Sequence, residues 1–110
     1  MSVLDAAKGH FQTLLDDEML SLEVAEWSTT IYWKPINLRE QGEIQALVSD
    51  GKTDEAVAMT LILRARNQDG SKMFKRGDAF EIRTLTDPDV VARIVTAMSE
   101  DYDDEELEKN

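Results

Sequence analysis

The chain has 110 residues, of which 42% are hydrophobic, and it carries a formal net charge of −11. This length suits one small domain, and the apolar content is sufficient for a core. The sequence contains no cysteine, which excludes disulfide bonds and thiolate metal sites and makes a reducing cytosol the expected compartment. We expect neither a signal peptide nor a membrane-spanning segment.

The negative charge is concentrated near the C-terminus. Residues 100–110 contain seven acids and one lysine, so this segment holds −6 of the total charge of −11. Such a segment has too few apolar residues to pack, and it repels phosphate groups. We therefore predict one globular domain over residues 1–99 and a flexible acidic tail over residues 100–110, with no nucleic acid and no membrane as partners.

Residues 3–16 are predicted to form an amphipathic helix. The acidic run over residues 16–18 ends the pattern, at a place where the negative end of the helix dipole makes acids unfavourable. The apolar stripe of this helix repeats at helical spacing and consists of Leu4, Ala7, Phe11, Leu14 and Leu15.

A β-hairpin is predicted to follow this helix. Leu20, Leu22 and Val24 alternate with polar residues, which is typical of a half-buried strand. Residues 29–33 are rich in β-branched and aromatic side chains, which favours a second strand. Pro35 should end that strand because it cannot donate a hydrogen bond to a ladder.

The next predicted helix begins after Asn37, which is in position to cap it, with Glu40 three residues later as in a capping box. Asp50 and Gly51 are expected to end it. Its apolar face is expected to consist of Leu38, Ile44, Leu47 and Val48.

A second central helix is predicted to be capped by Thr53. Its body, residues 56–65, is apolar on nearly every side, which is typical of the buried centre of a small domain. A turn is expected over residues 67–70. Residues 78–85 favour a short helix, with a short strand as the alternative.

The last predicted helix begins with Asp87 as its cap and Pro88 at its first position. One stripe of this helix is formed by Val90, Val91, Ile94, Val95 and Met98. The predicted fold class is therefore α+β, a mostly helical small single domain with an N-terminal β-hairpin and a disordered acidic C-terminal tail.

The sequence offers little catalytic chemistry. Its single histidine, His10, cannot build a multi-histidine metal site and has no recognisable nucleophile as a partner. The glycines form no phosphate-binding loop, and the turn over residues 67–70 lacks the alternating carboxylates of a calcium loop. We predict that the protein is not an enzyme and binds no cofactor or metal.

Candidate partner-binding residues come from three groups. Five cations between Arg64 and Arg76 could bind an acidic partner or the acidic tail, or could be an ordinary solvated loop. The hairpin aromatics could anchor an interface or pack in the core, and the stripe of the first helix could do either as well. The candidates are Leu4, Phe11, Leu14, Trp27, Tyr32, Trp33, Arg64, Arg66, Lys75 and Arg76.

Three stretches carry a resemblance to a known family. They are LEVAEWSTTIYWKPI (residues 22–36), DGSKMF (residues 69–74) and LTDPDVVARI (residues 85–94). In this order and spacing they resemble the tail assembly chaperone family of long-tailed, siphovirus-type bacteriophages and prophages. The resemblance covers about residues 11–98.

The resemblance implies a non-enzymatic role. Members of this family bind the long, largely helical tape measure protein during viral tail assembly, keep it soluble and help to recruit tail tube subunits. The expected partners are therefore the phage tape measure protein and the tail tube protein, with a homo-oligomer left open. The expected location is the cytoplasm of the host bacterium, and the protein should be absent from the mature virion.

Two other functions remain open from the sequence. An acidic inhibitor, such as a DNA-mimic protein that binds a basic host enzyme, should display its acids in ordered rows, whereas the acids here concentrate in the tail. A minor structural tail protein should be present in purified virions.

Overall fold

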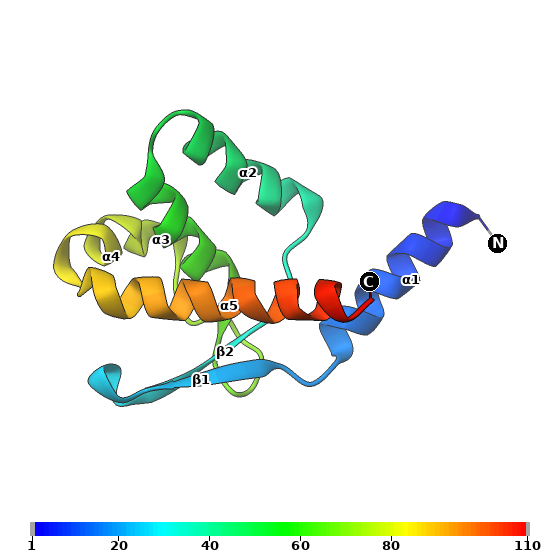
Figure 1. Cartoon of the computed structure of the whole chain (residues 1–110), viewed down its shortest axis with the longest axis horizontal. Helices are drawn as coiled ribbons and strands as arrows, with labels where there is room; N and C mark the ends of the chain where they lie inside the picture. The colour runs from blue at the N-terminus through cyan, green and yellow to red at the C-terminus, as the bar shows by residue number, and fades with distance from the viewer. Residues whose placement is uncertain (1, 110) are drawn as a thin grey trace.

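The computed structural model describes the backbone of residues 2–109 and the side chains of residues 2–99. It confirms the predicted mostly helical α+β fold with an N-terminal hairpin (Figure 1). Its elements are α1 (Val3–Asp16), β1 (Leu20–Val24), the 3₁₀ turn η1 (Ala25–Trp27), β2 (Thr29–Trp33), α2 (Leu38–Ser49), α3 (Thr53–Arg64), β3 (Ala65–Arg66), the 3₁₀ turn η2 (Arg76–Asp78), α4 (Ala79–Leu85) and α5 (Pro88–Lys109).

The strands form an antiparallel sheet in the order β1-β2-β3. Alternation along β2 sends Ile31 and Trp33 into the core, while Tyr32 lies on the other face of the sheet. Tyr32 and Trp33 therefore face opposite sides of the sheet. The short strand β3 is a correction to the sequence prediction, which placed Ala65 in the helical body.

Helix α3 lies at the centre of the domain, as its all-round apolar sequence predicts. Its neighbours are α2, α4 and α5, and the sheet joins the same core (Figure 1). The largest fully buried side chains come from the sheet, α3 and α5, and they are Val24, Ile31, Leu61, Ile62, Leu63, Ile94 and Met98.

Local signals set most helix ends. The capping box of α2 is confirmed, because Glu40 N–H donates to Asn37 Oδ1 at 2.8 Å and Asn37 N–H donates to Glu40 Oε1 at 3.0 Å. At its other end, Gly51 has a φ of +76° and Lys52 N–H donates to the Leu47 carbonyl at 2.9 Å, which is a Schellman motif. In α5, Asp87 caps the first turn by accepting from Asp89 N–H at 2.9 Å.

The predicted cap of α3 was wrong by one residue. The Lys52 carbonyl accepts the first helical hydrogen bond, from Ala56 N–H at 3.0 Å, so Lys52 is the N-cap. Thr53 is the first helical residue of α3, and the N-cap is the residue that precedes it.

Several apolar side chains of α2 and α4 are exposed. Helix α2 has no buried residue, and Leu38 at its start is 83% exposed. In α4, Ile82 is buried but Phe80 and Leu85 point to solvent. Phe80 lies two residues before Ile82 and therefore points to the opposite side of the helix, and Leu85 is the last residue of α4.

Helix α1 projects from the body of the molecule (Figure 1). The radius of gyration is 14.8 Å, compared with ~13 Å for a compact chain of this length. None of the described helices is long and apolar enough to cross a membrane. The backbone of α5 continues to Lys109, whereas the predicted domain ended at residue 99. The side chains of residues 100–110 lie outside the described part of the chain, and the flexibility of this acidic segment stays a prediction.

Two leucines in helices provide a test of where the core lies. Leu61 is fully buried in α3, and Leu85 at the end of α4 is 76% exposed. We expect Leu61→Ala to lower the free energy of unfolding by about 2–5 kcal/mol, because it leaves a cavity. The control Leu85→Ala should change it by less than about 0.5 kcal/mol in the same urea titration. If the two variants lose the same free energy of unfolding, the core is not centred on α3.

A second test concerns the ion pair that joins the hairpin to α5. Arg93 donates to both oxygens of Glu26, at 2.6 and 2.9 Å, and these hydrogen bonds lower the pKa of Glu26 from 4.5 to about 2. The unfolded carboxyl takes up a proton near pH 4.5 and the folded one only near pH 2. The pair therefore stabilises the fold above pH 4.5, and this contribution is lost as the pH falls towards 2.

We expect Glu26→Gln to flatten the fall in unfolding free energy between pH 4.5 and pH 2, measured by urea titration at each pH. The effect should be small, because the pair is at the surface and salt screens it. Glu23→Gln changes the net charge equally at an exposed position on β1 and serves as the control. The same pH profile for both variants would show that the pair does not stabilise the fold.

Candidate protein-binding site

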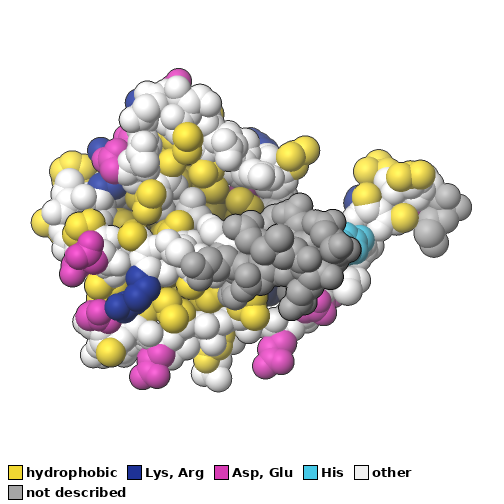
Figure 2. Space-filling model, in the orientation of Figure 1, with side chains coloured by type: hydrophobic (Ala, Val, Ile, Leu, Met, Phe, Trp, Pro, Cys, Tyr) yellow, Lys and Arg dark blue, Asp and Glu magenta, His cyan; other side chains and the backbone are white. Residues whose placement is uncertain are grey.

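The apolar stripe of α1 is exposed. We use the term α1 stripe for Leu4, Ala7, Phe11, Leu14 and Leu15. No residue of α1 is buried, and Leu4 is 66% exposed. Figure 2 shows hydrophobic side chains gathered on the projecting end of this helix. An apolar helix face without a cover is typical of a protein-binding surface.

The sequence forms this helix through local signals. The Ser2 side chain caps it by accepting from Asp5 N–H at 3.1 Å, and Asp5 lies in the first turn, where the helix dipole favours an acid. Phe11 and Leu15 are half-buried, whereas Leu4 and Leu14 remain exposed. The C-terminal half of α1 therefore has some cover, and its N-terminal half has none.

A hollow of about 470 Å³ lies at the C-terminal end of α1, and we call it the acidic hollow. It is formed where the end of α1, the end of β2 and the turn over residues 67–70 meet. Its lining residues are Leu15, Asp16, Asp17, Glu18, Met19, Tyr32, Lys34, Gln68, Asp69 and Gly70.

The charge of the acidic hollow is negative, since its lining includes four acids and one lysine. Asp69 accepts hydrogen bonds from the Ser71 hydroxyl at 2.6 Å and from the Ser71 N–H at 2.9 Å. These bonds lower the pKa of Asp69, so its carboxylate stays ionised at neutral pH. The hollow therefore attracts cations.

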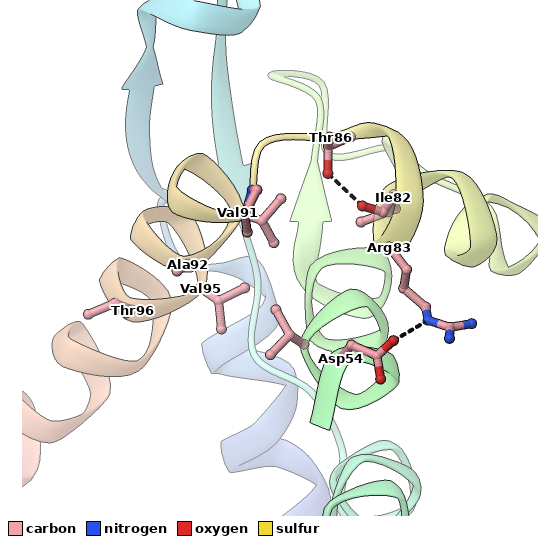
Figure 3. A pocket seen from close by; sticks show the side chains of 10 residues that line it. Asp54, Ile82, Arg83, Thr86, Val91, Ala92, Val95 and Thr96 are labelled. Carbon is pink, nitrogen blue, oxygen red and sulfur yellow. Dashed lines mark hydrogen bonds and ion pairs between the residues drawn. The ribbon is translucent and has the colours of Figure 1, made fainter. Parts of the chain in front are cut away.

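A second concave surface, the α3–α5 groove, has a volume of about 380 Å³. Figure 3 shows Val91 and Val95 of α5 at this groove, with Arg83 bound to Asp54 at its edge. That ion pair measures 2.8 Å between Arg83 Nε and Asp54 Oδ2. The lining residues are Asp54, Val57, Ile82, Arg83, Thr86, Pro88, Val91, Ala92, Val95 and Thr96.

The structure separates the three aromatic candidates. Tyr32 is half-buried and lines the acidic hollow, next to the end of α1. Trp27 is half-buried and packs against the core. Trp33 is only 3% exposed, so it is a core residue and not a surface contact. Its register opposite Leu20 and Ala65 places it in the interior of the sheet.

The predicted basic cluster is largely engaged within the chain. Arg64 donates to the carbonyls of Lys34 and Met98, and Arg66 donates to the carbonyls of Leu63 and Ala65. Arg76 forms an ion pair with Glu43 at 2.8 Å. Lys72 and Lys75 are exposed. These cations therefore do not form one free basic surface.

Sequence reasoning missed both concave surfaces. The acidic hollow joins three separate segments, and the α3–α5 groove joins α3 to residues 82–96, so no local pattern could indicate either surface. The acids of residues 16–18 were visible, but only as the end of a helix. Among the described residues, no three His, Asp or Glu side chains are placed to hold a metal ion. His10 is exposed on α1.

Comparisons with known proteins place this geometry in context. No protein-family model matches the chain. No curated protein matches it. Among solved structures, the bacteriophage HK97 tail assembly chaperone is similar, with a TM-score of 0.62 over 80% of this chain and 92% of that chain. The chain has a tail assembly chaperone fold. At 14% identity the likeness is one of fold, and it agrees with the family resemblance predicted from the sequence.

The exposure of α1 leads to a testable expectation about hydrogen exchange. Isolated helices shorter than about 12–15 residues are marginal in water, and α1 has 14 residues and buries none of them. We expect its amides to exchange much faster than those of α3 in the dilute protein, measured by mass spectrometry. Protection of α1 that rises with protein concentration would show instead that another copy covers it.

Proposed function

We propose that this protein is a phage tail assembly chaperone that binds the tape measure protein, keeps it soluble and helps to recruit tail tube subunits. It acts in the host cytoplasm and leaves before the virion is complete, without catalysis or a cofactor. The observation that supports the proposal is the uncovered α1 stripe, on a chain with the fold of the HK97 tail assembly chaperone.

The chemistry of the surface suits a long helical client. A client helix in water must cover its own apolar stripe, and α1 offers a second apolar helix against which it can pack. The strong net charge of the chain keeps such a complex soluble, because like-charged complexes repel one another. Of the predicted contact residues, we place Leu4, Phe11, Leu14 and Tyr32 in this proposed surface.

The role of α1 can be tested by coexpression with the tape measure protein encoded in the same phage genome. We expect the double variant Leu4→Glu/Leu14→Glu to lower the soluble fraction of the tape measure protein severalfold, because it places charge on the α1 stripe. The measurement is the amount of tape measure protein in the supernatant and in complex with the tagged chain.

The matched control is Leu38→Glu/Leu85→Glu. These leucines are also exposed. Leu38 lies at the start of α2 and Leu85 at the end of α4, so the control makes the same charge change at exposed positions near helix ends. The control should keep the tape measure protein soluble. If both double variants lower the soluble fraction of the tape measure protein equally, α1 is not the surface that binds it.

Two further outcomes would replace the proposal. If the tape measure protein stays insoluble with the wild-type chain, and a basic host enzyme is bound and inhibited instead, the protein is an acidic inhibitor. If the chain is found in purified virions in stoichiometric amounts, it is a minor structural tail protein.

A further inference from the structure

The α1 stripe and the acidic hollow form one continuous surface. Leu15 belongs to both, and Met19 and Tyr32 extend the apolar part into the hollow. A partner that packs along α1 therefore reaches the hollow with one of its ends. The 14 residues of α1 give this surface a length of about 21 Å along the helix.

The acids at this end of α1 are poorly compensated. The last turn of α1 contains no basic residue, and Asp17 is its C-cap. The negative end of the helix dipole lies at the same place as Asp16, Asp17 and Glu18, which disfavours these acids in the free chain. Lys34 is the one cation that lines the hollow. A partner with cations at this position would therefore gain electrostatic energy.

Tyr32 adds a second feature that favours a cation. Its ring lines the hollow together with the acids, and an aromatic face attracts lysine and arginine side chains. The long apolar stems of these two side chains can also pack on Leu15 and Met19 while their charged ends meet the carboxylates.

A second copy of this chain fits the surface poorly, because it brings a net charge of −11 towards a cluster of acids. A neutral apolar helix would cover the α1 stripe but would leave the acids uncompensated. The surface therefore selects for a helix that is both amphipathic and basic.

We propose that the α1 stripe and the acidic hollow bind a basic amphipathic helix, with its apolar stripe on α1 and its lysines or arginines in the hollow. This proposal rests on the proposed chaperone function and specifies which segments of the client are bound. Charge decides which of many amphipathic segments is selected, and the apolar contact supplies most of the affinity.

The test uses peptides of about 25 residues that tile the tape measure protein encoded in the same genome. Their binding to the full-length chain is measured by fluorescence anisotropy at two salt concentrations. We expect the bound peptides to combine apolar residues at helical spacing with a net positive charge. Their affinity should fall about tenfold at the higher salt, because exposed charge pairs are screened.

The sequence provides a matched pair of charge variants. Residues 16–18 and residues 103–105 have the same sequence, Asp-Asp-Glu. We expect Asp16→Asn/Asp17→Asn/Glu18→Gln to weaken binding about tenfold at low salt and to remove most of the salt dependence. The control Asp103→Asn/Asp104→Asn/Glu105→Gln makes the same charge change and should bind like the wild type.

Loss of folding can be separated from loss of binding. Removing acids from the negative end of α1 should not destabilise the helix, which circular dichroism checks. Neutral or acidic amphipathic peptides that bind as tightly as basic ones would overturn the proposal, as would equal effects of the two triple variants. Self-association that competes with the peptides and is lost in Leu4→Glu/Leu14→Glu would make a second copy the occupant.

The test also separates this proposal from the proposed function. If the intact tape measure protein is bound and kept soluble but its basic segments are not preferred, the chaperone function stands and the basic-helix proposal falls. If neither the intact protein nor any peptide binds, both fall.

Discussion

The burial of α3 is the constraint on which the rest of the structure depends. Because this helix is apolar on nearly every side, it must be covered on nearly every side. The apolar face of the sheet, α4 and α5 contribute to its cover, and α2 packs beside it. These elements complete the core without α1, which is attached at the far end of β1 from the η1 turn. The α1 stripe is exposed because the other elements supply the residues of the core and leave no part of it for α1 to cover.

The arginines hold this arrangement together across long sequence distances. Arg93 joins α5 to the hairpin, Arg76 joins η2 to α2, and Arg64 joins the end of β2 to α5 through backbone carbonyls. The chain has only 12 basic residues against 23 acidic ones. Cations used inside the domain cannot neutralise acids elsewhere, so the end of α1 keeps its negative charge.

The parts of the fold that depend on neighbouring residues could be predicted from the sequence. The parts that depend on contacts between distant residues could not. The bounds of α1, the hairpin, the cap at Asn37 and the Asp87-Pro88 start of α5 depend on neighbours within a few residues. The two-residue strand β3 is too short to show a periodicity. The pairing of Arg76 with Glu43 spans 33 positions, so the sequence left open whether these cations bind a partner or lie in a solvated loop, and it could not show this contact. The acidic hollow was hidden for the same reason, because it joins three distant segments.

The separation of α1 from the core has a consequence for how the protein can evolve. A substitution in a core helix changes binding and stability together, whereas positions without shared contacts contribute nearly independently. No side chain of α1 is buried, so its sequence can change without disturbing the packing around α3. The α1 stripe, which we propose as the binding face, can therefore diverge rapidly along with its proposed client, while the domain that carries it keeps the same shape.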